Sequence, residues 1–149
     1  MELPNWFQPR RLNRALLVAV SRGETQQVKQ LLDAGASANA ESQRRTALSI
    51  AGRSPWSSAA RVRLLLERGA FINGDPKRRT EKPLVIASHQ SDKERIRLLI
   101  TNGADVNARQ PEIGTGFTPL EELVSWADLE TLGLLLRTRR GYQQKMWRP

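Results

Sequence analysis

The single histidine, His89, and the nearby Asp92 are the first residues whose chemistry can be tested against their spacing. The pattern His-x-x-Asp places two potential metal ligands on one face of a helix. A zinc site needs three or four ligands, and the sequence contains neither a second histidine nor any cysteine. We therefore expect no metal site and no cofactor, and we expect His89 to be a surface histidine at a contact position.

Two further patterns resemble parts of an active site. The glycine-rich segment 114–116 is not followed by the lysine that grips a phosphate, so we interpret it as a turn. The adjacent Glu121 and Glu122 could carry out acid–base chemistry, but acidic residues also favour the positive end of a helix. We prefer the second interpretation because no other residues complete an active site, and the serines have no base except His89. The sequence therefore predicts a protein that is not an enzyme.

The composition favours an acidic partner. The chain has 149 residues, with 24 Lys+Arg against 15 Asp+Glu, which gives a net charge of +9. Such a balance suits acidic proteins, phosphate backbones or anionic surfaces, although it says nothing about the fold. Without cysteine there are no disulfides, and no apolar run approaches the ~20 residues that a membrane-spanning helix needs. We expect an intracellular protein, cytoplasmic or nuclear, with no membrane span.

An internal repeat positions these residues. Three Gly-Ala pairs begin at Gly35, Gly69 and Gly103, and both intervals are 34 residues. Each pair follows a leucine-rich run with the hydrophobic spacing of a helix. An asparagine follows every pair at the same distance: Asn39, Asn73 and Asn107. Glycine at these positions predicts a left-handed residue that ends the helix.

A second recurring element predicts where the other helix of each unit begins. Pro83 and Pro119 precede leucines and suit the first turn of a helix, where proline loses no hydrogen bond. Thr46 and Thr118 stand where a hydroxyl can cap the exposed backbone N–H groups. Each unit is thus predicted to contain two helices.

This unit resembles the ankyrin repeat, which has about 33 residues in a β-turn and two helices. The resemblance implies an all-α solenoid of stacked helix-turn-helix units with β-turn fingers. We expect four repeats, at about 12–40, 41–74, 75–108 and 109–141, in an ankyrin-repeat domain covering 12–141. Residues 1–11 are expected to form an N-terminal cap or flexible end, and residues 142–149 a basic C-terminal tail. The last repeat departs from the pattern, because Arg139 replaces the terminating glycine.

The same resemblance implies that a partner binds to the fingers and to the inner helices. Arginine and aromatic residues are enriched at interface hot spots. The candidate partner-binding residues are Arg22, Arg45, Arg53, Arg78, Arg79, His89, Gln90, Phe117 and Trp126. Trp126 could instead fill the core beneath the last repeat. The basic finger residues could also be a solvated surface that aids solubility.

Three function classes remain open. The leading hypothesis is a protein–protein interaction module whose partner is acidic. The alternative is nucleic-acid binding, since the chain has clustered lysine and arginine, although no series of aromatic residues interleaves with them. An enzyme on an ankyrin scaffold is disfavoured because no catalytic set is present.

Overall fold

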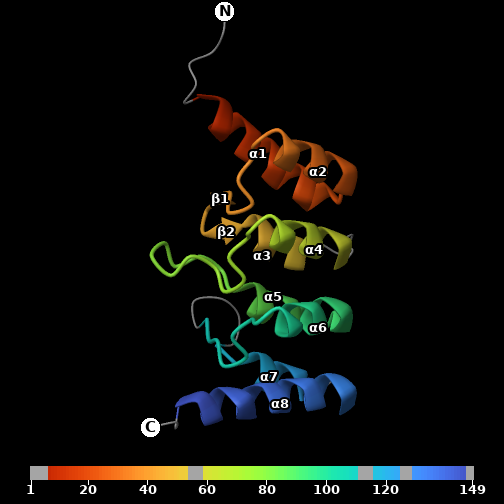
Figure 1. The fold of residues 1–149 in the computed structure, drawn as a ribbon, viewed down its shortest axis with the longest axis vertical. Coiled ribbons are helices and arrows are strands. Elements are labelled where there is room, and N and C mark those ends of the chain that lie inside the picture. The colour runs from red at the N-terminus through yellow and green to blue at the C-terminus, as the bar shows by residue number, and fades with distance from the viewer. Residues whose placement is uncertain (1–6, 54–58, 111–115, 125–128, 147–149) are drawn as a thin grey trace, which may run out of the picture.

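The computed structural model describes residues 7–53, 59–110, 116–124 and 129–146. Helices dominate these residues, and the helices form consecutive antiparallel pairs stacked along one axis (Figure 1). The helices are α1 (Phe7–Arg22), α2 (Thr25–Asp33), α3 (Ala47–Arg53), α4 (Ala59–Glu67), α5 (Pro83–His89), α6 (Lys93–Thr101), α7 (Pro119–Leu123) and α8 (Leu129–Met146). The fold is therefore all-α, as predicted.

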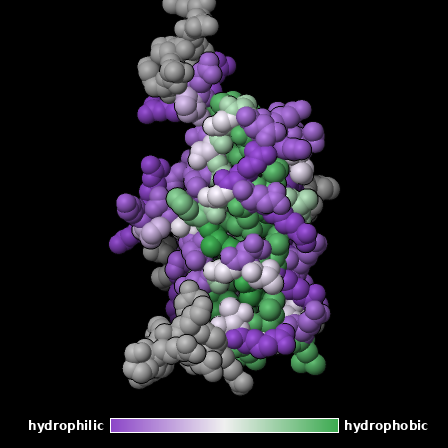
Figure 2. Space-filling view, in the orientation of Figure 1, coloured by the Kyte–Doolittle hydropathy of each residue, from purple (hydrophilic) through white to green (hydrophobic). Residues whose placement is uncertain are grey.

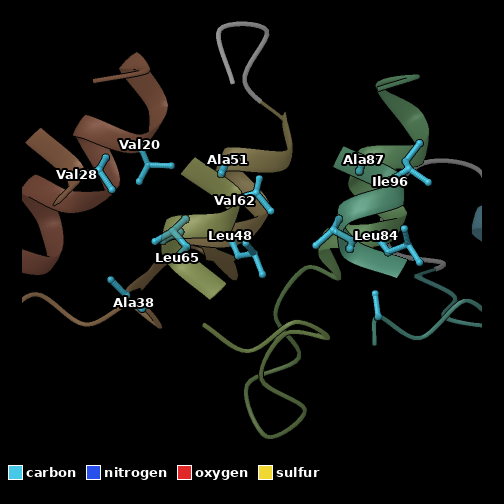
Figure 3. Close-up of a cluster of buried hydrophobic side chains, with 14 of the residues drawn as sticks. Val20, Val28, Ala38, Leu48, Ala51, Val62, Leu65, Leu84, Ala87 and Ile96 are labelled. Carbon is cyan, nitrogen blue, oxygen red and sulfur yellow. The ribbon is translucent and has the colours of Figure 1, made fainter. Parts of the chain in front are cut away.

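Two layers of helices run along the stack. The first helices of the pairs contact one another in the order α1, α3, α5, α7, and the second helices in the order α2, α4, α6, α8. Each pair also packs internally. The core lies between the layers, and Leu48, Leu65 and Leu84 are no more than 2% exposed within it (Figure 3). No single pair can bury its hydrophobic face alone, so stacking provides the core.

The predicted helix starts and ends are confirmed. Pro83 and Pro119 occupy the first turns of α5 and α7. The Thr46 hydroxyl accepts a hydrogen bond from the Ser49 N–H at 3.1 Å, next to the start of α3. The three terminating glycines have left-handed backbones, with φ values of 99° at Gly35, 82° at Gly69 and 91° at Gly103.

The recurring asparagines link one repeat to the next. Asn39 donates through Nδ2 to the Gly69 carbonyl at 3.0 Å and accepts from the Phe71 N–H at 2.7 Å. In the following repeat, Asn73 accepts from the Asp105 N–H at 2.8 Å. The side chains thus satisfy backbone groups of exposed loops, which explains why asparagine recurs with the repeat.

Buried Arg95 makes a second link between repeats. Its guanidinium donates to the Ala51 and Gly52 carbonyls, at 3.0 and 2.7 Å, near the end of α3. Its Nε lies 2.7 Å from a carboxylate oxygen of Asp92, which also caps α6. Arg61 lies nearby in the core, where burial and then the charge of Arg95 lower the pKa of Arg61. Arginine is thus part of the interior of this stack.

The helices extend beyond the boundaries expected from the repeats. Helix α1 begins at Phe7, ahead of the predicted repeat start, so part of the expected N-terminal segment is helical. Helix α8 continues to Met146, so it includes part of the expected tail. The absence of a glycine at the position of Arg139 explains this extension, because nothing there favours a helix end.

Candidate interaction surface

The fingers described by the structure are the loops that lead into α3 and α5, and they protrude on one side of the stack (Figure 1). The second-repeat finger is a two-stranded antiparallel hairpin, β1 (Glu41–Ser42) and β2 (Arg45–Thr46). Its turn residues Gln43 and Arg44 have left-handed backbones, as a tight hairpin turn requires. The third-repeat finger (residues 75–82) is built from turns rather than strands.

A buried carboxylate, Glu81, joins these two fingers. The Glu81 side chain is 5% exposed and lies 2.9 Å from Nη2 of Arg53 and 3.5 Å from Nε of Arg45. The Glu81 N–H donates to the Arg44 carbonyl at 2.8 Å. Arg45 and Arg53, two predicted partner-binding residues, are therefore brought together around a carboxylate of the chain itself.

Glu81 is thus a buried residue of a finger. A carboxylate is rarely buried unless it is paired, and the two arginines supply that pairing. In the sequence, Glu81 stands out only as an acidic residue two positions before Pro83, where a helix was predicted to begin. Its partners are distant in the chain, so the repeat pattern alone did not identify them.

Arg78 and Arg79 lie side by side on the third-repeat finger but have different surroundings. Arg78 donates to Glu41 of the preceding finger at 2.7 Å and lies 3.9 Å from Asp75. The hydrogen bond to Glu41, and then its charge, raise the pKa of Arg78. Arg79 accepts a bond from Arg44 Nε through its carbonyl at 2.9 Å, and its exposed side chain forms no ion pair within the described residues.

His89 and Gln90 lie at the end of α5. The His89 Nδ1 is 3.5 Å from Glu122 of α7, and the histidine side chain is 23% exposed. This contact joins the third and fourth repeats, so His89 is more enclosed than the surface histidine that the sequence predicted. Gln90 is exposed and caps α5. The part of the chain that the structure describes contains no group of three His, Cys, Asp or Glu side chains suited to a metal ion.

The two carboxylates of α7 have structural roles. Glu121 accepts from the Thr118 N–H at 2.6 Å and from its hydroxyl at 2.9 Å, and Thr118 in return accepts from the Glu121 N–H. These bonds lower the pKa of Glu121, and the bond from the Thr118 backbone has the largest effect. The nearby Arg109 lowers this pKa further. The interpretation of these acids as helix-start residues agrees with this capping box.

The remaining predicted site residues are spread along the stack. Phe117 is 48% exposed beside α7, whereas Arg22 is exposed at the end of α1 in the first repeat. These two residues are not brought together. Trp126 and the glycine-rich segment 114–116, except for Gly116, lie outside the described residues. Within the described ranges, no helix combines the length and hydrophobicity needed to cross a bilayer.

Comparison with known proteins agrees with the repeat geometry. The family model described as Ankyrin repeat matches residues 82–110, which include α5, α6 and the loop containing Asn107. No curated protein is similar enough to this sequence to count as a relative.

Proposed function

We propose that this chain, in which residues 82–110 match the ankyrin repeat, is a protein-interaction module whose third-repeat finger binds an acidic segment of a protein partner. Ankyrin repeats are typically interaction scaffolds without catalytic activity. The observation that carries the proposal is the set of exposed cations on this finger.

The cations lie at the protruding end of the finger, where the surface is strongly hydrophilic (Figure 2). Lys77 and Arg79 are exposed and form no ion pair among the described residues, while Arg78 remains 65% exposed despite its contact with Glu41. Of these three adjacent cations only Arg78 contacts carboxylates of the chain, Glu41 and Asp75, so positive charge remains available for a partner.

The backbone beneath these cations is already ordered. The Asp75 N–H donates to the Thr80 hydroxyl at 2.6 Å, the Thr80 N–H donates to the Asp75 carbonyl at 3.3 Å, and the Lys77 N–H donates to the Asp75 carboxylate at 2.9 Å. A loop ordered before binding loses less conformational entropy when the partner binds. This arrangement supports a binding role over simple solvation.

The test replaces Lys77 and Arg79, which form no ion pair among the described residues, and keeps the ion pair between Arg78 and Glu41. Lys77→Glu with Arg79→Glu is compared with Lys29→Glu and Arg63→Glu, which make the same charge change on exposed positions of α2 and α4. Tagged proteins capture partners from the native host, and mass spectrometry quantifies them. We expect a partner that the wild type and the control retain and the finger variant loses. Equal capture by both variants would remove the finger from the proposal.

Nucleic acid is the competing partner for the same cations. Neutralising several phosphates makes affinity fall steeply with salt. Filter binding of DNA and RNA across salt concentrations, repeated with the finger variant, distinguishes the two cases. Salt-sensitive binding that the finger variant loses would favour nucleic acid over an acidic protein.

A further inference from the structure

Helix α1 has hydrophobic residues on two faces, but only one face has a neighbouring repeat. Leu16 and Val20 are fully buried against the rest of the stack. A second stripe contains Ala15 and Val18, which are three residues apart, and at its edge lies Leu12, which is partly buried against the core. Val18 is 42% exposed.

The corresponding helix of the second repeat shows what this stripe lacks. Helix α3 contacts α1 on one side and α5 on the other, whereas α1 contacts α3 and, among the described elements, no first helix on its opposite side. The outer stripe of α1 therefore lies on the side where α3 packs against another helix, but no described helix packs against it there.

Two hollows along this face form one groove. One, of about 360 Å³, is lined by Ala15, Val18 and Ala19 of α1 and reaches the start of α2. The other, of about 340 Å³, lies beside Leu12. Both are lined by Arg11 and Ala15, so they lie next to each other along α1. From Gln8 to Arg22 the helix rises about 21 Å, enough to accommodate a partner helix of similar length.

The charge around this groove is one-sided. Arg11, Arg14 and Arg22 are exposed on its lining, and none forms an ion pair or a side-chain hydrogen bond within the described part of the chain. Among the residues that the structure describes, Glu24 is the one carboxylate on the lining. An apolar groove between unpaired arginines is complementary to a helix with an apolar stripe flanked by acidic residues.

We propose that the groove on α1 is a docking site for an acidic amphipathic helix of another protein. This surface lies at the first repeat, away from the third-repeat finger, and the proposal does not depend on the function proposed above. The partner's apolar stripe covers Leu12, Ala15 and Val18, and its carboxylates pair with the arginines.

The probe is a designed helical peptide of about 15 residues, with leucines at helix-face spacing and glutamates on both sides of them. A peptide of the same composition with a scrambled order is its control. Fluorescence anisotropy measures binding to the full chain. We expect Arg11→Glu with Arg14→Glu to weaken binding about tenfold or more, and Val18→Ser to weaken it as well. Lys29→Glu with Arg63→Glu should change it less than about twofold, and circular dichroism verifies that every variant is folded.

Several results would overturn the proposal. Equal binding of the scrambled peptide would show attraction by charge alone. Trp6 directly precedes α1 in the sequence, and peptide binding that appears only after Trp6→Ser would assign the groove to the chain's own N-terminal segment. Sedimentation showing a dimer that Val18→Ser dissociates would assign it to a second copy. Binding to anionic vesicles that the α1 variants abolish, without an effect on the peptide, would assign it to a membrane surface.

Discussion

The middle repeats (residues 41–108) contain ten arginines and α1 contains four, and the two sets differ in what they contact. In the middle, Arg53 reaches Glu81, Arg78 reaches Glu41 and Arg95 reaches Asp92. On α1, Arg11 and Arg14 reach no carboxylate among the described residues. The net charge of the chain therefore does not indicate which cations are available to a partner.

The local supply of carboxylates explains the difference. Residues 7–40 contain only Glu24 and Asp33, and Asp33 pairs with Arg68 of the second repeat. In the middle repeats, Glu81 and Glu41 lie on fingers, where arginines of a neighbouring repeat reach them. Asp92 lies at the start of α6 and pairs with Arg95 of the same helix. Several arginines in the middle, such as Arg53, Arg78 and Arg95, therefore link neighbouring repeats, whereas those of α1 remain exposed to solvent.

The largest expected effect comes from Arg95→Ala. The substitution removes the bonds to the Ala51 and Gly52 carbonyls and leaves those buried groups and Asp92 without their donor. We expect the free energy of unfolding to fall by about 3 kcal/mol. Urea unfolding followed by circular dichroism measures it. The matched change Arg14→Ala on α1 should alter stability by less than about 0.5 kcal/mol, and equal losses would contradict the comparison.

A smaller loss is expected from Glu81→Ala. The change removes the shared partner of Arg45 and Arg53, but these arginines are partly exposed and water can hydrate them. We expect a loss of about 2 kcal/mol, below that of a fully buried pair. The same unfolding measurement applies, with exposed Glu67→Ala as the control. A loss no greater than that of the control would mean that Glu81 does not hold the two fingers together.

A third prediction compares Asn39 and Asn107, which occupy the same position in two different repeats. Asn39 makes two side-chain bonds to the next repeat, whereas the side chain of Asn107 makes none among the described residues. We expect Asn39→Ala to lower the unfolding free energy by about 1 to 2 kcal/mol and Asn107→Ala to leave it nearly unchanged. Thermal denaturation of both variants tests this, and similar midpoints would show that the link between repeats is energetically neutral.

The smallest effect concerns pH and the last repeat. Because the pKa of Glu121 is lowered in the folded state, its stabilising contribution is fully present above the ordinary value of 4.5 and is lost as pH falls through the lowered pKa. Glu121 is exposed, so we expect only a small loss of stability on acidification. Glu121→Gln should flatten this dependence, whereas Glu67→Gln should not. Unfolding curves measured between about pH 5 and pH 2 provide the comparison.

The sequence predicted the features that depend on local geometry. The left-handed backbones of Gly35 and Gly69 and the first-turn position of Pro119 follow from the φ angles that these residue types allow. The fold class followed from their spacing. These features need only neighbouring residues, so a single repeat already contains the signal.

The candidate site was less predictable because its contacts join different repeats. Arg53 and Glu81 are 28 residues apart, and Arg95 and Ala51 are 44 apart. Whether such residues meet depends on how far each finger bends and on which helix end faces it. The residue types therefore indicated Arg53 but not the unpaired Arg11 and Arg14, whose importance depends on the absence of nearby carboxylates.

The asparagine bonds between repeats have a consequence for the timing of local motion. The N–H groups of Phe71 and Asp105 lie in surface loops, where backbone amides usually exchange with solvent deuterium quickly. Here each amide is held by the side chain of the preceding repeat, at 2.7 Å for Phe71 and 2.8 Å for Asp105. Breaking these hydrogen bonds requires adjacent loops to separate, so the amides of Phe71 and Asp105 should exchange more slowly than the amide of Asn73. Asn39→Ala should accelerate the exchange at Phe71 alone.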